Sequence, residues 1–400
     1  MHINDVLKMA IDKDASDIHI KVGAYPYIRV HGELFPLVEL RRLTQEDTLR
    51  MAFDVMSENQ KQKFQKHQEI DIAYSVPGLG RFRVNIFQQR GTVGMVLRVI
   101  SFEITSVREL NLPPVIERVA MYARGLILCT GTTGSGKSTT LAAMIDFINQ
   151  NRTCHIITIE DPIEFLHRDK KSIINQREVE VDTKSFSIAL RSGLRQDPDV
   201  ILVGEMRDYE TIETALTAAE TGHLVLSTLH TMDAMETINR IISVFPPYQQ
   251  KQVRMQLASV LKAVISMRLM QRSDGRGRVP AVEIMISTNL IQDFIINKEK
   301  TRMIPDAIAA GISQYGMQTF DQSLFYLYKK ELITLEEALK GASNPDDFKL
   351  RVQGIESTSS SAQSQMEQSM ADPFAKGDSS QQMEGGGMND FIFDNSHNQR

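Results

Sequence analysis

The stretch that decides the fold reads Gly131-Thr132-Thr133-Gly134-Ser135-Gly136-Lys137-Ser138 and matches G-x-x-x-x-G-K-[S/T] at every fixed position. An apolar run at 126–129 precedes it, and apolar residues at helical spacing follow it from Leu141 to Ile148. A glycine-rich loop between a strand and a helix presents backbone N–H groups to phosphates. The stretch therefore predicts a nucleoside triphosphate site.

Each part of this loop has an expected task. The glycines let the backbone fold around an anion. Lys137 is expected to reach the β- and γ-phosphates, and the Ser138 hydroxyl to bind Mg²⁺. Thr139 either caps the first helical turn or touches the α-phosphate. The predicted nucleotide-binding set is Gly131, Thr132, Thr133, Gly134, Ser135, Gly136, Lys137, Ser138 and Thr139.

Apolar strands alternate with helical segments on both sides of the loop. The expected strands are 126–130, 155–159, 200–203, 224–227 and 281–286. Helices are expected at 249–270, 305–310 and 335–339. Strands that alternate with helices are typical of a parallel sheet covered on both faces, so the pattern predicts an α/β fold.

The chain before the loop has a different pattern. Residues 1–99 combine helical spacing at 3–13 and 45–56, a tight turn at 31–34, and alternating strands at 81–87 and 93–99, which predicts a small α+β domain. A proline-containing linker is expected at 100–114 and the second domain at 115–356. Residues 357–400 are rich in Ser, Gln, Gly and acids and are expected to be disordered. The apolar cluster at 391–393 is either a docking motif or a segment without a role.

Composition restricts the function classes. The net charge is −5, and the segment from Glu356 onward, with seven acidic residues against Lys376 and Arg400, accounts for all of it. A nearly neutral body argues against a nucleic-acid motor, so no nucleic-acid partner is expected. Two cysteines are too few for a four-ligand zinc site or a disulfide framework. No targeting or membrane-spanning segment is recognisable, so a cytoplasmic location is expected.

Two acids follow predicted strands, where ligands bind in parallel sheets. Glu164 lies in Glu160-Asp161-Pro162-Ile163-Glu164 and is expected to polarise the attacking water as general base. The apolar run 200–203 is followed by Gly204 and then by Glu205. Gly204 stands where an Asp is usual. Glu205 is therefore expected to supply the contact to the waters of Mg²⁺ or to share the base role. The predicted metal-binding pair is Ser138 and Glu205.

Basic residues complete the candidate site. His230 follows the strand at 224–227 and is expected to sense the γ-phosphate or to bond an acid, and His223 at the other end is a weaker candidate. Arg81 and Arg83 alternate onto one face of a first-domain strand. A row of arginines is most often a solvated sheet face. A ring-shaped ATPase, however, needs a positive group from another domain or subunit at the γ-phosphate, and Arg81, Arg83 and Arg98 are the strand-borne arginines best suited to supply it.

Five ordered motifs carry a family resemblance, namely 14–19, 131–139, 157–165, 203–208 and 221–231. They are similar to those of the secretion ATPase superfamily, and over residues 1–355 the chain resembles its PilT-type retraction ATPases of type IV pili. The resemblance implies a PAS-like first domain, a RecA-like P-loop ATPase domain and a homohexameric ring. It also implies ATP and Mg²⁺ as cofactors, a His box at His223 and His230, and catalytic inter-domain arginines such as Arg83 and Arg98. The family's Ala-Ile-Arg-Ala-Gly motif departs here, because Ala309 replaces its Arg.

The expected function is a motor that hydrolyses ATP to retract type IV pili. Its expected partners are further copies of itself and an inner-membrane platform protein, so that it meets the inner face of the cytoplasmic membrane only through partners. The alternatives are an accessory retraction ATPase, a pilus-assembly or type II secretion ATPase, a RecA-like nucleic-acid motor and a non-catalytic nucleotide-binding scaffold. The intact Lys137, Glu164 and Glu205 argue against the scaffold.

Overall fold

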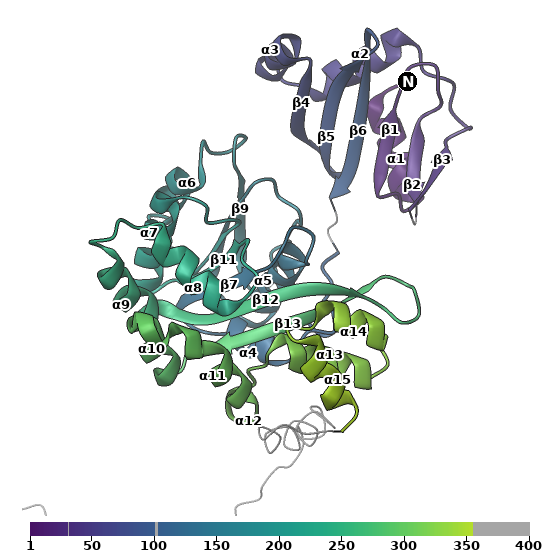
Figure 1. Ribbon diagram of the computed structural model, residues 1–400. Helices are drawn as coiled ribbons and strands as arrows, with labels where there is room; N and C mark the ends of the chain where they lie inside the picture. Colours follow the sequence, from purple (N-terminus) through teal and green to yellow (C-terminus); the bar gives the residue numbers. More distant parts are fainter. Residues whose placement is uncertain (31, 101–102, 355–400) are drawn as a thin grey trace, which may run out of the picture.

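The computed structural model describes residues 1–30, 32–100 and 103–354 (Figure 1). Two β-sheets organise these residues, each with its own apolar core. His31, in the expected turn, and the tail expected at 357–400 lie outside the described residues.

The first sheet has six strands in the order β3-β2-β1-β6-β5-β4, and all its neighbouring strands are antiparallel. They are β1 (Asp17–Ile20), β2 (Tyr27–Val30), β3 (Glu33–Pro36), β4 (Glu69–Val76), β5 (Gly80–Gln89) and β6 (Thr92–Ile100). The accompanying helices are α1 (Ile3–Asp12), α2 (Gln45–Val55) and α3 (Glu58–His67). The strands expected at 81–87 and 93–99 are confirmed. The expected turn extends too far, because Glu33 and Leu34 already belong to β3.

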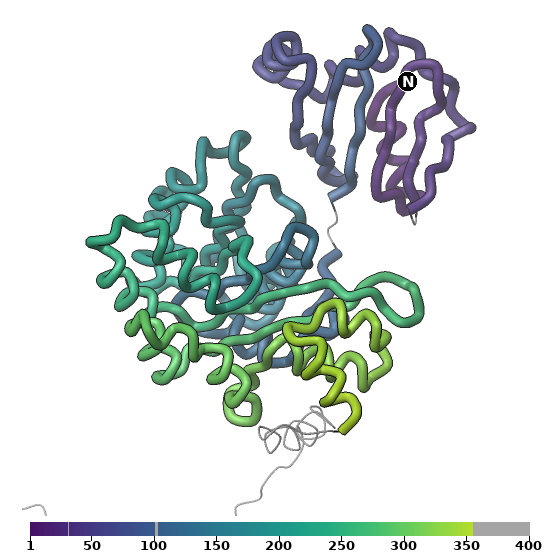
Figure 2. Tube along the Cα trace, viewed as in Figure 1, coloured from purple at the N-terminus to yellow at the C-terminus, as the bar shows by residue number. Residues whose placement is uncertain are grey.

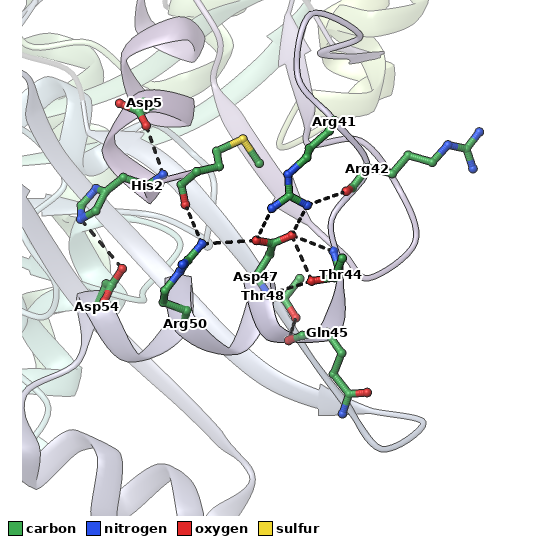
Figure 3. A network of polar contacts seen from close by, with 11 residues as sticks. His2, Asp5, Arg41, Arg42, Thr44, Gln45, Asp47, Thr48, Arg50 and Asp54 are labelled. Carbon is green, nitrogen blue, oxygen red and sulfur yellow. Dashed lines mark hydrogen bonds and ion pairs between the residues drawn. The ribbon is translucent and has the colours of Figure 1, made fainter.

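Capping explains where α2 begins. The Thr44 side chain accepts the Asp47 backbone N–H, and the Asp47 carboxylate accepts the Thr44 N–H at 3.0 Å. Arg41 and Arg50 also bind this carboxylate (Figure 3). The Arg41 guanidinium in particular holds the pKa of the buried Asp47 well below its usual range. This network fixes α2 within the first sheet's unit, which comprises β1 to β6 with α1, α2 and α3.

The second sheet has seven strands in the order β13-β12-β7-β11-β10-β8-β9. They are β7 (Gly125–Thr130), β8 (His155–Glu160), β9 (Ile173–Glu178), β10 (Val200–Val203), β11 (Leu224–Leu229), β12 (Leu261–Gln271) and β13 (Arg278–Ile286). All pairs are parallel except β12 with β13. Strands β7, β10 and β11 are buried along their whole length, as strands covered on both faces must be. The predicted α/β class is confirmed.

Helices cover this sheet and continue after its last strand (Figures 1 and 2). Helix α4 (Val115–Ala120) precedes β7. Those between the strands are α5 (Lys137–Asn151), α6 (Phe186–Gly193), α7 (Tyr209–Glu220), α8 (Ala234–Ser243) and α9 (Gln250–Val260). After β13 come α10 (Asn289–Ile296), the 3-10 helix η1 (Lys298–Met303), α11 (Ile304–Ala310), α12 (Ile312–Tyr315), α13 (Phe320–Lys329), α14 (Leu335–Gly341) and α15 (Pro345–Val352). The helices expected at 305–310 and 335–339 are confirmed. None of the helices in the described ranges is both long enough and apolar enough to cross a bilayer.

Two expectations for the end of the sheet are wrong. The helix expected at 249–270 ends at Val260, and Leu261–Gln271 form β12. The run Ala263–Met267 is buried throughout, and a strand buried on both faces has no alternation that distinguishes it from a buried helix. The strand expected at 281–286 is part of β13, which returns antiparallel to β12 instead of joining the sheet in parallel.

Candidate active site

The glycine-rich loop follows β7 and leads directly into α5. Gly131, Gly134 and Gly136 all have positive φ, at 139°, 78° and 98°. A Cβ on Gly131 would stand 2.5 Å from the Met267 carbonyl oxygen, so this position excludes any larger residue. Helix α5 begins at Lys137 without a side-chain cap. Its first N–H groups are therefore available to an anion.

Lys137 lies in the floor of this loop and is 8% exposed. Its Nζ donates to the carbonyl oxygens of Gly131 and Thr132, each at 2.8 Å. Burial lowers the pKa of Lys137, whereas Cys129, Glu205 and Glu164 act in the opposite direction. The ammonium group therefore lies within the electrostatic reach of both predicted acids.

A cavity of about 770 Å³ brings together most of the predicted site residues. It is lined from the loop by Thr133, Gly134, Gly136, Lys137, Ser138 and Thr139, and from the strand ends by Glu160, Asp161, Pro162, Glu164, Gly204, Glu205, Arg207, Thr228 and His230. Arg83 of β5 and Arg278 of β13 also line it. Strand register explains the convergence, because Val203 of β10 pairs with Ile159 of β8 and Ser227 of β11. The carboxyl ends of the three strands therefore meet at one edge of the sheet.

The missing acid after β10 has a packing reason. A Cβ on Gly204 would stand 3.1 Å from the Ile159 carbonyl oxygen and 3.3 Å from the Glu160 Cα. A side chain there would pack more tightly than usual against the backbone of β8, and the acid stands one residue later. The Glu205 carboxylate accepts from Arg207 Nε and lies 3.3 Å from His230 Nε2.

The two acids of the β8 end have different surroundings. Glu160 is enclosed and accepts from Thr158 Oγ1 at 2.6 Å and Gln176 Nε2 at 3.1 Å. Burial raises the pKa of Glu160. Glu164 is exposed on the loop that follows and lines the cavity. A water-activating carboxylate needs this access to solvent, so the geometry favours Glu164 over Glu160.

The two histidines lie at opposite ends of β11. His230 follows the carboxyl end and lines the cavity. His223 precedes the strand, and its Nδ1 lies 2.9 Å from the Ala218 carbonyl oxygen at the end of α7. The structure therefore brings His230, but not His223, to the other site residues.

The arginines divide in the same way. Arg83 reaches the cavity from the first sheet. Arg98 is its register partner on β6 and donates to Asp17 at 3.0 Å instead, with 69% of its side chain exposed. Arg207 and Arg278 line the cavity without having been predicted, although Arg207 stands only two residues after Glu205.

A second cavity of about 610 Å³ adjoins the first at the start of α5. Both are lined by Gly136, Thr139, Leu269 and Arg278. The apolar side chains of Leu110, Leu112 and Leu269 contribute to the second cavity, with Arg272 and Arg276 at its edge. A surface of this kind suits a flat base and its sugar.

The donor set also suits a phosphate-bound cation. In the part of the chain that the structure describes, no group of three or more His, Cys, Asp or Glu residues forms a metal cage of its own. Mg²⁺ does not need one, because it usually keeps several waters and binds one or two protein oxygens and phosphates. Ser138 and Glu205 line the same cavity. In the loop before α5, the buried Ser135 Oγ has no hydrogen-bond partner among the described residues. These residues fit a magnesium nucleotide.

Comparisons with known proteins show what this chain is similar to. The family described as "Type II/IV secretion system protein" matches residues 1–314. The chain is 47% identical over 348 residues to the type IV pilus retractation ATPase PilT of Pseudomonas aeruginosa, covering 87% of this chain and 100% of that protein. It is 42% identical over 352 residues to the type IV pilus ATPase PilU of the same organism, covering 88% and 91%. Its fold is similar to a crystal structure of the pilus retraction motor PilT with bound ADP, with a TM-score of 0.79, 49% identity, and coverage of 87% and 98%.

Proposed function

This chain belongs to the family of type II/IV secretion system proteins, and we propose that it is a Mg²⁺-dependent ATPase motor that powers retraction of type IV pili and twitching motility. The observation that carries the proposal is one cavity lined by the nucleotide loop, Glu164, Glu205 and Arg83. The similarity to PilT over almost the whole described chain supports pilus retraction as the output.

The residues have separate tasks in this proposal. When bound, ATP supplies the phosphoanhydride bond, and Mg²⁺ supplies positive charge at the phosphates. Lys137 and the N–H groups at the start of α5 bind the phosphates. Ser138 and Glu205 hold the cation, directly or through water. Because Arg207 and His230 already engage Glu205, the proton of the attacking water goes to Glu164.

Arg83 gives the first sheet a part in the chemistry. It stands on a different unit from the loop and the acids, yet lines the same cavity. A guanidinium brought to the γ-phosphate stabilises the charge of the transition state. Movement of the first sheet's unit toward or away from the cavity therefore couples hydrolysis to a change of shape.

The assembly and location follow from the same proposal. The chain works as a homohexameric ring in the cytoplasm and meets the inner face of the cytoplasmic membrane through an inner-membrane pilus platform protein. The similarity to PilU supports a second candidate, an accessory retraction ATPase acting beside another motor.

The test is to delete the gene and count retracting pili by fluorescence microscopy. We expect retraction events to fall by more than tenfold and to return when the full chain is supplied. Normal retraction with lost pilus assembly would assign the chain to assembly instead. In the purified protein, ATP turnover that rises severalfold with DNA or RNA would favour a nucleic-acid motor.

A further inference from the structure

One ion pair connects the two sheets of the molecule. Arg81 Nη2 of β5 donates to Glu178 Oε2 at the end of β9 over 2.8 Å, although 97 positions separate them in the chain. Within the described ranges, no other ion pair joins a residue before 100 to a residue after 114. Both side chains are enclosed, with 17% of Arg81 and 5% of Glu178 exposed.

The same carboxylate also holds the backbone beside Glu164. Glu178 Oε2 accepts the Ile163 N–H at 3.1 Å. Ile163 immediately precedes Glu164. The oxygen that binds Arg81 therefore also binds the residue next to the proposed base. The Glu178 N–H in turn donates to the Asp182 carboxylate at 2.8 Å, which fixes the strand end itself.

The position of Arg81 on β5 links this contact to the cavity. Arg81 and Arg83 alternate onto one face of the strand, and Arg83 lines the nucleotide cavity. A cleft of about 660 Å³ lies beside the pair, with Arg83 and Ile100 on one wall and Asp161, Pro162 and Glu178 on the other. A displacement that opens this cleft must separate Arg81 from Glu178.

We infer that Arg81 and Glu178 are positioning residues for hydrolysis: their ion pair makes the geometry of the Glu164 loop depend on where the first sheet's unit lies. When the units approach, Arg81 neutralises Glu178, and Glu178 fixes the Ile163 N–H and hence the direction of Glu164. When they separate, the enclosed Glu178 carboxyl group loses its partner, and the Glu164 loop loses this constraint. The Glu164 carboxylate is therefore oriented to act as general base only when Arg83 also lies at the cavity.

This inference rests on the proposed ATPase function. It adds a second way in which the first sheet influences hydrolysis, besides the direct action of Arg83. Arg81 itself does not line the nucleotide cavity, so its removal should alter the catalytic step more than nucleotide binding. A misplacement of about 1 Å costs on the order of 10²-fold in rate. Arg81→Gln is therefore expected to lower kcat by about 10²-fold with KM within about threefold of the parent.

Steady-state ATPase assays of the full chain test this, with Arg81→Gln, Glu178→Gln and the double variant compared in a cycle. Because the pair acts as a unit, the double variant should lose no more activity than the more affected single variant. Arg81→Lys keeps a charged donor and should remain within about tenfold of the parent. Arg50→Gln is the matched control, since Arg50 binds Asp47 within the first unit (Figure 3) and should leave kcat unchanged.

Amide hydrogen exchange gives a readout that does not depend on hydrolysis. The Ile163 amide should exchange at least tenfold faster in Arg81→Gln than in the parent, whereas amides of the buried strand β7 should not change. Unchanged Ile163 exchange, or losses in kcat that simply multiply in the double variant, would overturn the inference. A parent chain without any ATPase activity would instead refute the proposed function, while the exchange measurement would still test the ion pair.

Discussion

Replacing Glu283 by Gln should remove a specific pH dependence of stability. Glu283 lies on β13, is 7% exposed, and accepts the Ala234 N–H at 2.9 Å. It therefore holds the first residue of α8, the helix that follows the His230 loop. Burial raises the pKa of Glu283 to about 7, with smaller contributions in the same direction from Asp233 and Asp321. The Ala234 N–H and Arg268 lower it.

The sign follows from the raised pKa. A carboxyl whose pKa is higher in the folded than in the unfolded chain adds stability that is complete below the unfolded value of 4.5 and is lost as the pH rises through about 7. For this group, lowering the pH from 8 to 6 should add about 1 kcal/mol to the free energy of unfolding. In a unit of about 240 residues, that corresponds to a rise of about 2–4 °C in the melting temperature.

The assay is thermal unfolding of the parent and Glu283→Gln at pH 6, 7 and 8. Only the difference between the two proteins is used, because His167 has an opposite pH dependence. Burial lowers the pKa of His167 to about 4, so the stability that its neutral form contributes is lost as the pH falls. Relative to the variant, the parent should gain about 2–4 °C between pH 8 and 6. Glu299→Gln, at an exposed acid of the same unit, is the control and should give parallel curves. A difference between parent and Glu283→Gln that stays constant over this pH range would refute the assignment.

Three further predictions concern the site and the tail. Lys137→Ala should weaken ATP binding and abolish turnover, whereas Glu164→Gln should bind ATP like the parent and lose about 10²-fold or more in kcat, as calorimetry and phosphate release would show. Arg83→Ala should lose on the order of 10³-fold in kcat with nucleotide affinity within about tenfold, and Arg98→Ala should lose less because Arg98 is paired with an acid of its own sheet; equal losses would contradict the observed placement. A chain that ends at Gly354 should keep its melting temperature, oligomeric state and ATPase rate, so a smaller assembly in light scattering would show that the tail contributes to the ring.

The fold could be predicted from the sequence where local patterns of apolar spacing and turn residues are strong. The strand, loop and helix around Lys137 were predictable because the glycines, the charge and the apolar spacing agree within about twenty residues. Strand β12 was mistaken for the end of a helix, since its buried run has no period. Strand β9 was missed because it lies at the sheet edge and is largely polar and partly exposed. The sequence pattern was weakest at these two strands.

The candidate site shows the same division. Glu164, Glu205 and His230 were predictable from their positions just after strands, which parallel pairing brings to one edge. Which arginine reaches the cavity depends instead on pairs that are distant in the chain, Arg98 with Asp17 and Arg81 with Glu178. No local spacing encodes such contacts, so the structure was needed to assign them.

ATP hydrolysis by this chain is proposed to drive retraction of the pilus. The most direct test compares the speed of pilus retraction with and without ATP turnover. A strain that lacks the gene would be supplied with the parent chain or with Glu164→Gln at equal levels, and single-pilus retraction would be recorded in an optical trap. We expect retraction with the parent and none with Glu164→Gln. Retraction at the parent speed with a variant that does not hydrolyse ATP would contradict the claim and assign the chain an accessory role beside another motor.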